Sequence, residues 1–189
     1  MTDIAVLESI FDTPSWVLEI QKRCAGNSAT DFLKSAIELA EASARSGCGP
    51  FGALIVSADG HIVAAGWNNV ILNHDSTLHA EIHAIRRAEH HFKTHNLASV
   101  PGAPLTIYCS CPPCIQCFGA IYWSGIKEVV SAGSKSLAES AGFDEGPIDQ
   151  SLWQKAHQNK QIKFKLIDDP VLKPEAPFKL YKKLGGRLY

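Results

Sequence analysis

The chain of 189 residues has no long apolar stretch, no marked excess of charge of one sign and no internal repeat. No apolar run approaches the roughly 18 to 20 residues of a transmembrane helix, so we expect no membrane partner. The first residues do not combine a basic segment with an apolar one, so no secretory signal is expected. The formal net charge is −1, whereas proteins that grip a nucleic acid backbone usually carry a basic excess. A nucleic acid partner is therefore not expected.

Apolar residues make up 46% and charged residues 20% of the chain, which is typical of a globular protein with a full hydrophobic core. Six cysteines occur without an export signal. In a reducing compartment, clustered cysteines bind metal more often than they form disulfides. We therefore expect a cytoplasmic protein and look for a metal site.

Hydrophobic periodicity predicts an α/β fold, a three-layer α/β/α sandwich with a mixed sheet of about five strands. The expected helices are 29–45, 78–92, 113–123, 148–158 and 178–184. The expected strands are 51–57, 62–67, 105–109, 127–132 and 162–167. The first two strands flank a turn that contains Gly60, which indicates a hairpin. Segments 68–77 and 139–147 are predicted to be loops.

The N-terminal part of the chain looks like an addition to this domain. Residues 3–23 carry a helix-like apolar pattern that Pro14 interrupts, and a turn follows it. We therefore predict a helical extension over residues 1–28 and a main domain over residues 29–189.

Two short clusters carry the candidate chemistry, and each is expected to begin a helix. One contains His79 and Glu81, and the other contains Cys114 and Cys117 after Pro113. One histidine and two cysteines give three protein ligands for zinc and leave the fourth position for water, as catalytic zinc sites require. The positive end of a helix dipole also favours thiolate over thiol. The sequence therefore predicts one Zn²⁺ per chain on His79, Cys114 and Cys117.

Glu81 is the predicted proton carrier of this site. Residues i and i+2 of a helix point apart, so Glu81 is not expected to share a ligand face with His79. His-x-Glu followed by Pro-Cys-x-x-Cys is the signature of zinc nucleobase deaminases, in which the glutamate is the general acid and base. Either half alone is weak evidence, since a lone Cys-x-x-Cys is as often structural or redox-active. The two halves together are specific.

Other interpretations of these residues stay open at this point. His83 follows His79 by four residues and could pair with it on a metal, although the glutamate position of a metalloprotease motif is missing. Cys109 and Cys111 could supply further thiolates or be small buried side chains. The zinc could also merely stabilise a non-catalytic interaction domain.

The sequence resembles the cytidine-deaminase superfamily and, within it, the guanine deaminases of that fold. The resemblance covers about residues 31–146 and the C-terminal end. It rests on PFGALIV at 50–56, NNV at 68–70, TLHAE at 77–81, SCPPC at 110–114, CFGAIYW at 117–123 and AGFDE at 141–145. It implies a cytidine-deaminase-like fold and the zinc-dependent hydrolysis of guanine to xanthine and ammonia, without an organic cofactor.

The resemblance also implies roles for single residues. Glu81 and Glu145 correspond to catalytic residues, with Glu145 assisting proton transfer to the leaving amine. The implied substrate-binding residues are Phe51, Asn68, Ala80, Trp123 and Tyr189. Tyr189 corresponds to a C-terminal aromatic residue that closes the active site of a partner subunit in a swapped homodimer. Each of these residues also has a simpler interpretation, such as a turn cap for Asn68, core for Trp123, a surface charge for Glu145 and a frayed terminus for Tyr189.

The chain departs from the family pattern at three places. Pro112 stands where the family usually has glutamate, and Glu145 stands where it often has the shorter aspartate. Residues 1–28 have no counterpart, and 150–173 match poorly. The same zinc chemistry could serve guanosine, cytosine, a tRNA adenosine or an s-triazine, so the substrate stays open among these rings.

Overall fold

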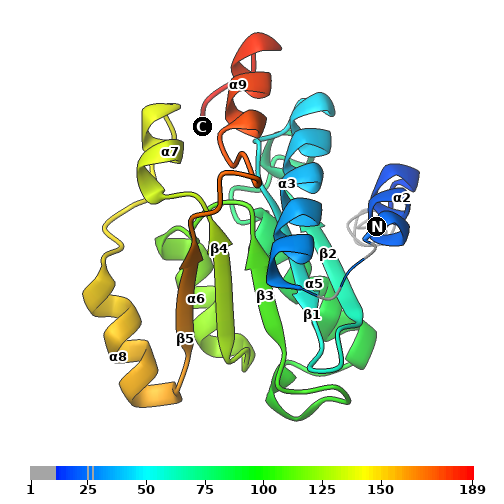
Figure 1. Ribbon diagram of the computed structural model, residues 1–189, viewed down its shortest axis with the longest axis vertical. Helices are drawn as coiled ribbons and strands as arrows, with labels where there is room; N and C mark the ends of the chain where they lie inside the picture. The colour runs from blue at the N-terminus through cyan, green and yellow to red at the C-terminus, as the bar shows by residue number, and fades with distance from the viewer. Residues whose placement is uncertain (1–11, 25, 27) are drawn as a thin grey trace, which may run out of the picture.

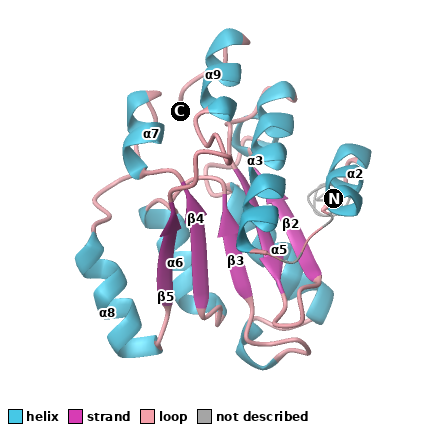
Figure 2. Cartoon of the chain, viewed as in Figure 1, coloured by secondary structure: helices cyan, strands magenta, loops and turns pink. Residues whose placement is uncertain are grey.

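The computed structural model describes residues 12–24, 26 and 28–189 and contains one five-stranded mixed sheet (Figure 1, Figure 2). The strands are β1 (Gly52–Val56), β2 (Ile62–Trp67), β3 (Thr106–Cys109), β4 (Glu128–Ala132) and β5 (Lys163–Ile167). Their order is β2-β1-β3-β4-β5. β1 is antiparallel to both of its neighbours, whereas β3, β4 and β5 run parallel. The predicted hairpin and the predicted mixed sheet are both confirmed.

Helices cover both faces of this sheet, as the three-layer prediction requires. α3 (Ala29–Arg45) packs on one face, and α5 (Ala80–Phe92) and α6 (Ile115–Ser124) lie on the other. Two glycines permit the close approach. A Cβ on Gly52 would collide with the backbone of α3 at Ala36, and a Cβ on Gly66 would collide with the backbone of α5 at Ala80.

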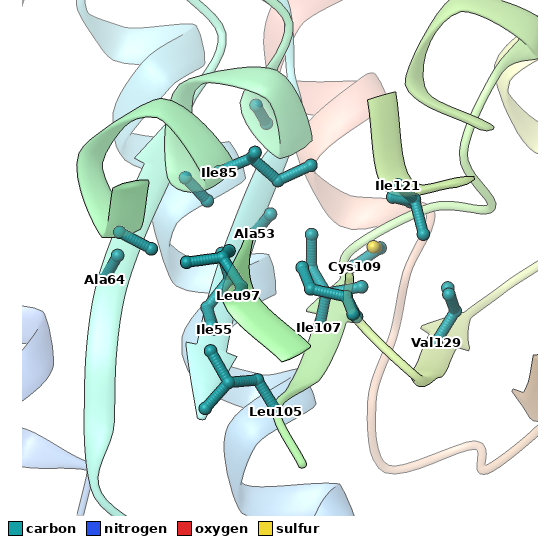
Figure 3. Packing of buried hydrophobic residues seen from close by; sticks show 14 of the residues in the cluster. Ala53, Ile55, Ala64, Ile85, Leu97, Leu105, Ile107, Cys109, Ile121 and Val129 are labelled. Carbon is teal, nitrogen blue, oxygen red and sulfur yellow. The ribbon is translucent and has the colours of Figure 1, made fainter. Parts of the chain in front are cut away.

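Alternating side chains of β1 divide the core between the two faces. Ala53 and Ile55 point toward α5 and α6, where they join the largest buried cluster (Figure 3). Leu54 and Val56 point toward α3 and pack with Phe32 and Leu39. β1 is buried on both faces, which explains its uninterrupted apolar sequence.

The remaining helices surround the sheet. They are α2 (Ser15–Arg23), α4 (Val70–Asn73), α7 (Lys135–Ser140), α8 (Gln150–Lys160) and α9 (Ala176–Lys183), and a 3-10 turn, η1, spans Leu97–Ser99. α4 lies in a segment predicted to be loop, and α7 was not predicted, because four to six residues are too short for helical periodicity to be recognised.

The N-terminal prediction is partly outside the described residues, since 1–11 are not among them. α2 begins directly after Pro14, which is its N-cap residue. It packs on the main body through Trp16, whose ring meets that of Trp67 edge to face at 5.3 Å. The division at residue 28 stays a prediction. Within the described part of the chain, no helix has both the length and the apolar character that a membrane crossing needs.

Candidate active site

The two predicted clusters meet where the N-termini of α5 and α6 lie side by side. His79 is the N-cap residue of α5, and Cys114 is the N-cap residue of α6. His79 Nδ1 lies 3.4 Å from Cys114 Sγ, although 35 positions separate the two residues. The ligand atoms of His79, Cys114 and Cys117 all lie within 4.8 Å of one another. Three such atoms, one nitrogen and two sulfurs, fit a zinc ion and leave one position open.

The electrostatics of the thiols agree with a metal-binding role. Hydrogen bonds with Cys117 and His79 lower the pKa of the Cys114 thiol to about 4. Cys114 Sγ also accepts the backbone N–H of Cys117 at 3.5 Å, so this N-cap residue is poised as a thiolate. Burial raises the pKa of the Cys117 thiol well above its ordinary value. A cation held between the two sulfurs would favour the thiolate form of both.

Glu81 lies in the first turn of α5 beside the ligand set. Only 6% of its surface is exposed, and its Oε2 accepts a hydrogen bond from Cys117 Sγ at 3.2 Å. Burial, and then the nearby Cys114 thiolate, raise the pKa of Glu81 to about 7. A carboxyl group whose pKa is near neutrality can both accept and return a proton, as a general acid and base must.

Glu145 reaches the same place from the loop after α7. Its exposed fraction is 5%, so the alternative of a solvated surface charge is wrong. Burial, followed by the charges of Cys114 and Glu81, raises the pKa of Glu145 to about 8. Two carboxyl groups with raised pKa values therefore face one ligand set.

A cavity of about 310 Å³ opens above these groups. Its lining includes Phe51, Glu81, Pro112, Phe143, Glu145 and Tyr189. Pro112, which replaces the family's usual glutamate, thus gives the wall an apolar surface. The volume is at the lower end for small-molecule sites, which suits a small ring better than a large ligand.

Asn68 directly follows β2 and is buried; it is not among the residues that line this cavity, but it lies beside Gly49 next to the hydroxyl group of Tyr189, which does line it. Its side-chain Oδ1 accepts the backbone N–H groups of Gly49 at 3.2 Å and Val70 at 3.3 Å. Its Nδ2 is buried and makes no hydrogen bond of ordinary geometry, although the Asn68 side chain faces the Tyr189 hydroxyl and partly offsets the burial that raises the pKa of that phenol. A buried polar atom without a partner costs free energy, so it calls for an explanation such as a bound ligand. The fixed Oδ1 leaves this amide able only to donate.

The C-terminal Tyr189 lies over the pocket of its own chain. Its ring packs edge to face on Phe143 at 5.7 Å, and a Cβ on Gly49 would collide with its hydroxyl group. The segment before it is fixed by Tyr181, whose hydroxyl donates to Arg187 O at 2.6 Å. Tyr189 is therefore tied down as a pocket wall rather than frayed.

Trp123 and Ala80 do not line this pocket. Trp123 is 73% exposed, and the Lys160 ammonium lies 4.0 Å from the centre of its ring. At 100° per residue, Trp123 lies about 240° around α6 from Cys117, so it faces away from the pocket of its own chain. The expectation that Trp123 is an aromatic residue of the pocket is therefore wrong for the pocket of its own chain. The Ala80 side chain lies in the core, between two pocket residues.

The alternative ligands are excluded by their surroundings. His83 is fully buried, packs on the Trp67 ring and has its Nδ1 3.1 Å from Trp67 O, so it does not pair with His79 on a metal. Cys109 is buried in the core beside Ile107 and Val129 (Figure 3). Cys111 is buried and contacts Ser134 O. Among the described residues, only His79, Cys114 and Cys117 form a candidate metal cluster.

Some residues that line the pocket were not predicted from the sequence. Gln116 Nε2 donates to Ser76 O at 3.3 Å, which links α6 to the loop before α5. Phe143 was part of a matching stretch but was given no role. The position of Gln116 between the two cysteines could have indicated that it lies near the site.

Comparisons with known proteins agree with this geometry. Residues 27–132 match the family model described as the cytidine and deoxycytidylate deaminase zinc-binding region. The chain is 36% identical to the guanine deaminase of Bacillus subtilis (strain 168) over 157 residues, which cover 82% of this chain and 95% of the relative.

Two solved structures are also similar. The guanine deaminase from Nitrosomonas europaea has a TM-score of 0.76 at 26% identity, covering 92% of this chain and 93% of that chain. A solved complex with 2,6-diaminopurine has a TM-score of 0.78 at 28% identity, covering 91% and 89%. The zinc-type ligand set, the mixed sheet and these matches lead to the same conclusion: this chain belongs to the cytidine and deoxycytidylate deaminase family.

Proposed function

We propose that this protein is a hydrolase that converts guanine to xanthine and ammonia. The observation that carries the proposal is the buried Glu81 carboxyl, which contacts Cys117 beside the three candidate zinc ligands. The guanine specificity is supported by the similarity to guanine deaminases. A carboxyl group buried at this place is unnecessary for a structural zinc site but is required for proton transfer.

Zinc on His79, Cys114 and Cys117 would lower the pKa of a water molecule toward neutrality and so supply the nucleophile. Glu81 accepts the proton of this water and delivers it to the guanine ring at N3 as C2 is attacked. Glu145, whose pKa burial raises, can give a proton to the departing amine and regain one from the C2 hydroxyl group as that group becomes the carbonyl. Each carboxyl group thus has a distinct proton to move.

Asn68 is proposed to orient the ring. Its Nδ2 can only donate, and guanine presents the acceptors N7 and O6 along one edge. Adenine presents an amine in place of O6, so a fixed donor fits guanine better on that edge. Phe51 packs against the ring, and Tyr189 covers it. Ala80 contributes through its backbone, since its side chain is in the core.

A homodimer in the cytoplasm is the proposed assembly and compartment. Trp123 is exposed on α6, and Gly119, one turn before it, has nothing within 4 Å of an added Cβ, so this helix surface has room for a partner. The six free cysteines suit a reducing compartment. Purine metabolism would be the setting of a guanine hydrolase.

The swap of Tyr189 into a partner's pocket stays a prediction, since the described chain carries Tyr189 over its own pocket. Mixing subunits that carry Glu81→Gln with subunits that lack Tyr189 tests it. A swapped tail gives mixed dimers in which the pocket with an intact Glu81 regains Tyr189 and hence activity. A tail that closes its own pocket gives no recovery.

Ammonia release from guanine, guanosine, adenine, cytosine and cytidine in parallel tests the proposed activity. We expect release from guanine, and its loss in Glu81→Gln with zinc still bound at one per chain. Release from a nucleoside or a pyrimidine instead would contradict the guanine assignment but keep the zinc chemistry. Stoichiometric zinc without turnover of any ring, including triazines, would favour the non-catalytic domain.

A further inference from the structure

The loop between α7 and α8 carries Glu145 into the pocket, and its buried apolar anchors are Phe143, two residues before Glu145, and Ile148, three residues after it. It contains Gly142 and Gly146, both of which have positive φ. Glycine loses more conformational freedom on folding than other residues, so such a loop needs specific tethers to hold a side chain in place. Between Phe143 and Ile148 the loop has no further buried apolar side chain, so the position of the Glu145 carboxyl depends there on the hydrogen bonds of the loop backbone.

Two of these hydrogen bonds come from near the site or from the loop itself. Glu145 O accepts the backbone N–H of Ile115 at 3.1 Å, which ties the loop to the first turn of α6. Asp144 Oδ1 accepts the backbone N–H of Gly146 at 2.9 Å within the loop. They fix the loop on the side of the zinc ligands.

A third tether comes from the opposite side, from the short helix α7. Lys135 Nζ donates to Gly146 O at 3.0 Å. The same ammonium group lies 3.0 Å from Glu139 Oε1, one turn along α7. The Gly146 carbonyl also accepts the backbone N–H of Ile148 at 2.8 Å. Lys135 thus joins the end of β4, through α7, to the residue that directly follows Glu145.

We propose that Lys135 is a positioning residue of the deamination reaction, because its bond to the Gly146 carbonyl holds the Glu145 carboxyl in the pocket. The proposal rests on the proposed function, in which Glu145 gives a proton to the departing amine. The Lys135–Glu139 ion pair alone is an exposed i,i+4 pair, which stabilises a protein little. The effect of Lys135 is therefore expected in catalysis more than in stability.

The chain offers a matched control. Lys127 Nζ also donates to a backbone carbonyl, that of Lys160, at 2.9 Å, and it is partly buried as well. It lies on the strand end away from the pocket and is not among the pocket residues. Lys127→Met removes the same kind of bond without affecting the loop of Glu145.

The experiment compares Lys135→Met, Lys135→Arg and Lys127→Met by guanine turnover, melting temperature and amide hydrogen exchange over residues 143–148. A misplacement of about 1 Å can reduce catalysis by up to about a hundredfold, so Lys135→Met should lower kcat roughly ten- to a hundredfold with KM little changed. Lys135→Arg should restore most of the activity because it can still donate to Gly146 O. Exchange over 143–148 should be faster in Lys135→Met alone.

Wild-type kcat and wild-type exchange in Lys135→Met would overturn the proposal, and so would equal losses in Lys135→Met and Lys127→Met. A loss confined to KM would also contradict it. If the wild-type chain does not act on guanine, the proposed function fails. Hydrogen exchange then still decides whether Lys135 holds the loop.

Discussion

Two of the hollows on the described surface differ in an instructive way. The pocket at the N-termini of α5 and α6 has a volume of about 310 Å³, whereas a hollow between α8 and β5 has a volume of about 420 Å³. The larger hollow is lined by Trp153, His157 and Phe164, with the Trp153 and Phe164 rings stacked at 4.5 Å. Its polar side chains are largely exposed. Size and aromatic content therefore do not identify the site.

Burial of ionisable groups separates the two hollows. Glu81 and Glu145 are each at least nine-tenths buried, and both have raised pKa values. Burial of an ionisable group costs free energy unless other groups compensate it, so two such carboxyl groups beside two thiols indicate a function.

The largest effect is expected from Glu81→Gln. This change keeps the shape of the side chain but removes the proton carrier, and general acid–base catalysis contributes roughly a hundred- to ten-thousandfold to rate. We expect kcat to fall by at least about a hundredfold while the zinc content stays at one per chain. Steady-state kinetics together with metal analysis measures both. Loss of zinc with the activity would contradict a purely proton-carrying role.

Removal of the metal should destabilise the protein. A ligand that binds only the folded state stabilises it, by about 2.7 kcal/mol when its concentration is a hundredfold above Kd. A chelator should therefore lower the melting temperature of the wild-type chain but have little effect on Cys114→Ser, which lacks one ligand. Equal sensitivity of the two proteins to the chelator would argue against Cys114 as a ligand.

Asn68→Asp should give an intermediate effect. The aspartate can still accept the N–H groups of Gly49 and Val70, but it loses the Nδ2 donor. An unpaired buried group costs roughly 1 to 3 kcal/mol, so kcat/KM for guanine should fall about ten- to a hundredfold. A variant with unchanged kcat/KM would show that Asn68 is only a turn residue.

A smaller effect is expected from Glu145→Gln, on the pH dependence of the stability of the metal-free protein. The pKa of Glu145 is raised to about 8 from an ordinary value of 4.5, so between these pH values the folded state holds a proton that the unfolded state has lost. Stability then falls as pH rises through this window. Glu145→Gln should flatten part of this slope, and Glu81 accounts for a further part. Denaturant titrations at several pH values measure it, and an unchanged slope would contradict the burial of Glu145.

The smallest effect is expected in the hollow between α8 and β5. Gln154→Glu and His157→Gln change exposed polar side chains, and such substitutions usually alter stability by no more than about 0.5 kcal/mol. Guanine kinetics should stay at the wild-type values. A loss of kcat in either variant would remove the distinction between the two hollows.

His79 and Glu81 lie within one helical turn of each other, and so do Cys114 and Cys117. At such short spacing the sequence determines the relative direction of the side chains, so the zinc ligands and Glu81 could be predicted. The positions of the strands along the chain followed from apolar runs separated by turns, whereas their order in the sheet was not predicted. The helix α7 could not be predicted because it has only six residues, and the role of Lys135 could not because its side chain bonds a backbone carbonyl in a loop eleven residues away. Trp123 was misplaced, since similarity to a family suggests a role for an aromatic residue but not the direction in which its side chain points. Tyr189 illustrates the same limit.

The most direct test of the account is guanine hydrolysis in ¹⁸O-labelled water, followed by mass spectrometry of the purine product and an ammonia measurement. The account predicts xanthine that carries one ¹⁸O atom, equal amounts of xanthine and ammonia, and neither product with Glu81→Gln. Xanthine without the label, or no xanthine from zinc-loaded protein, would contradict hydrolytic deamination of guanine at this site.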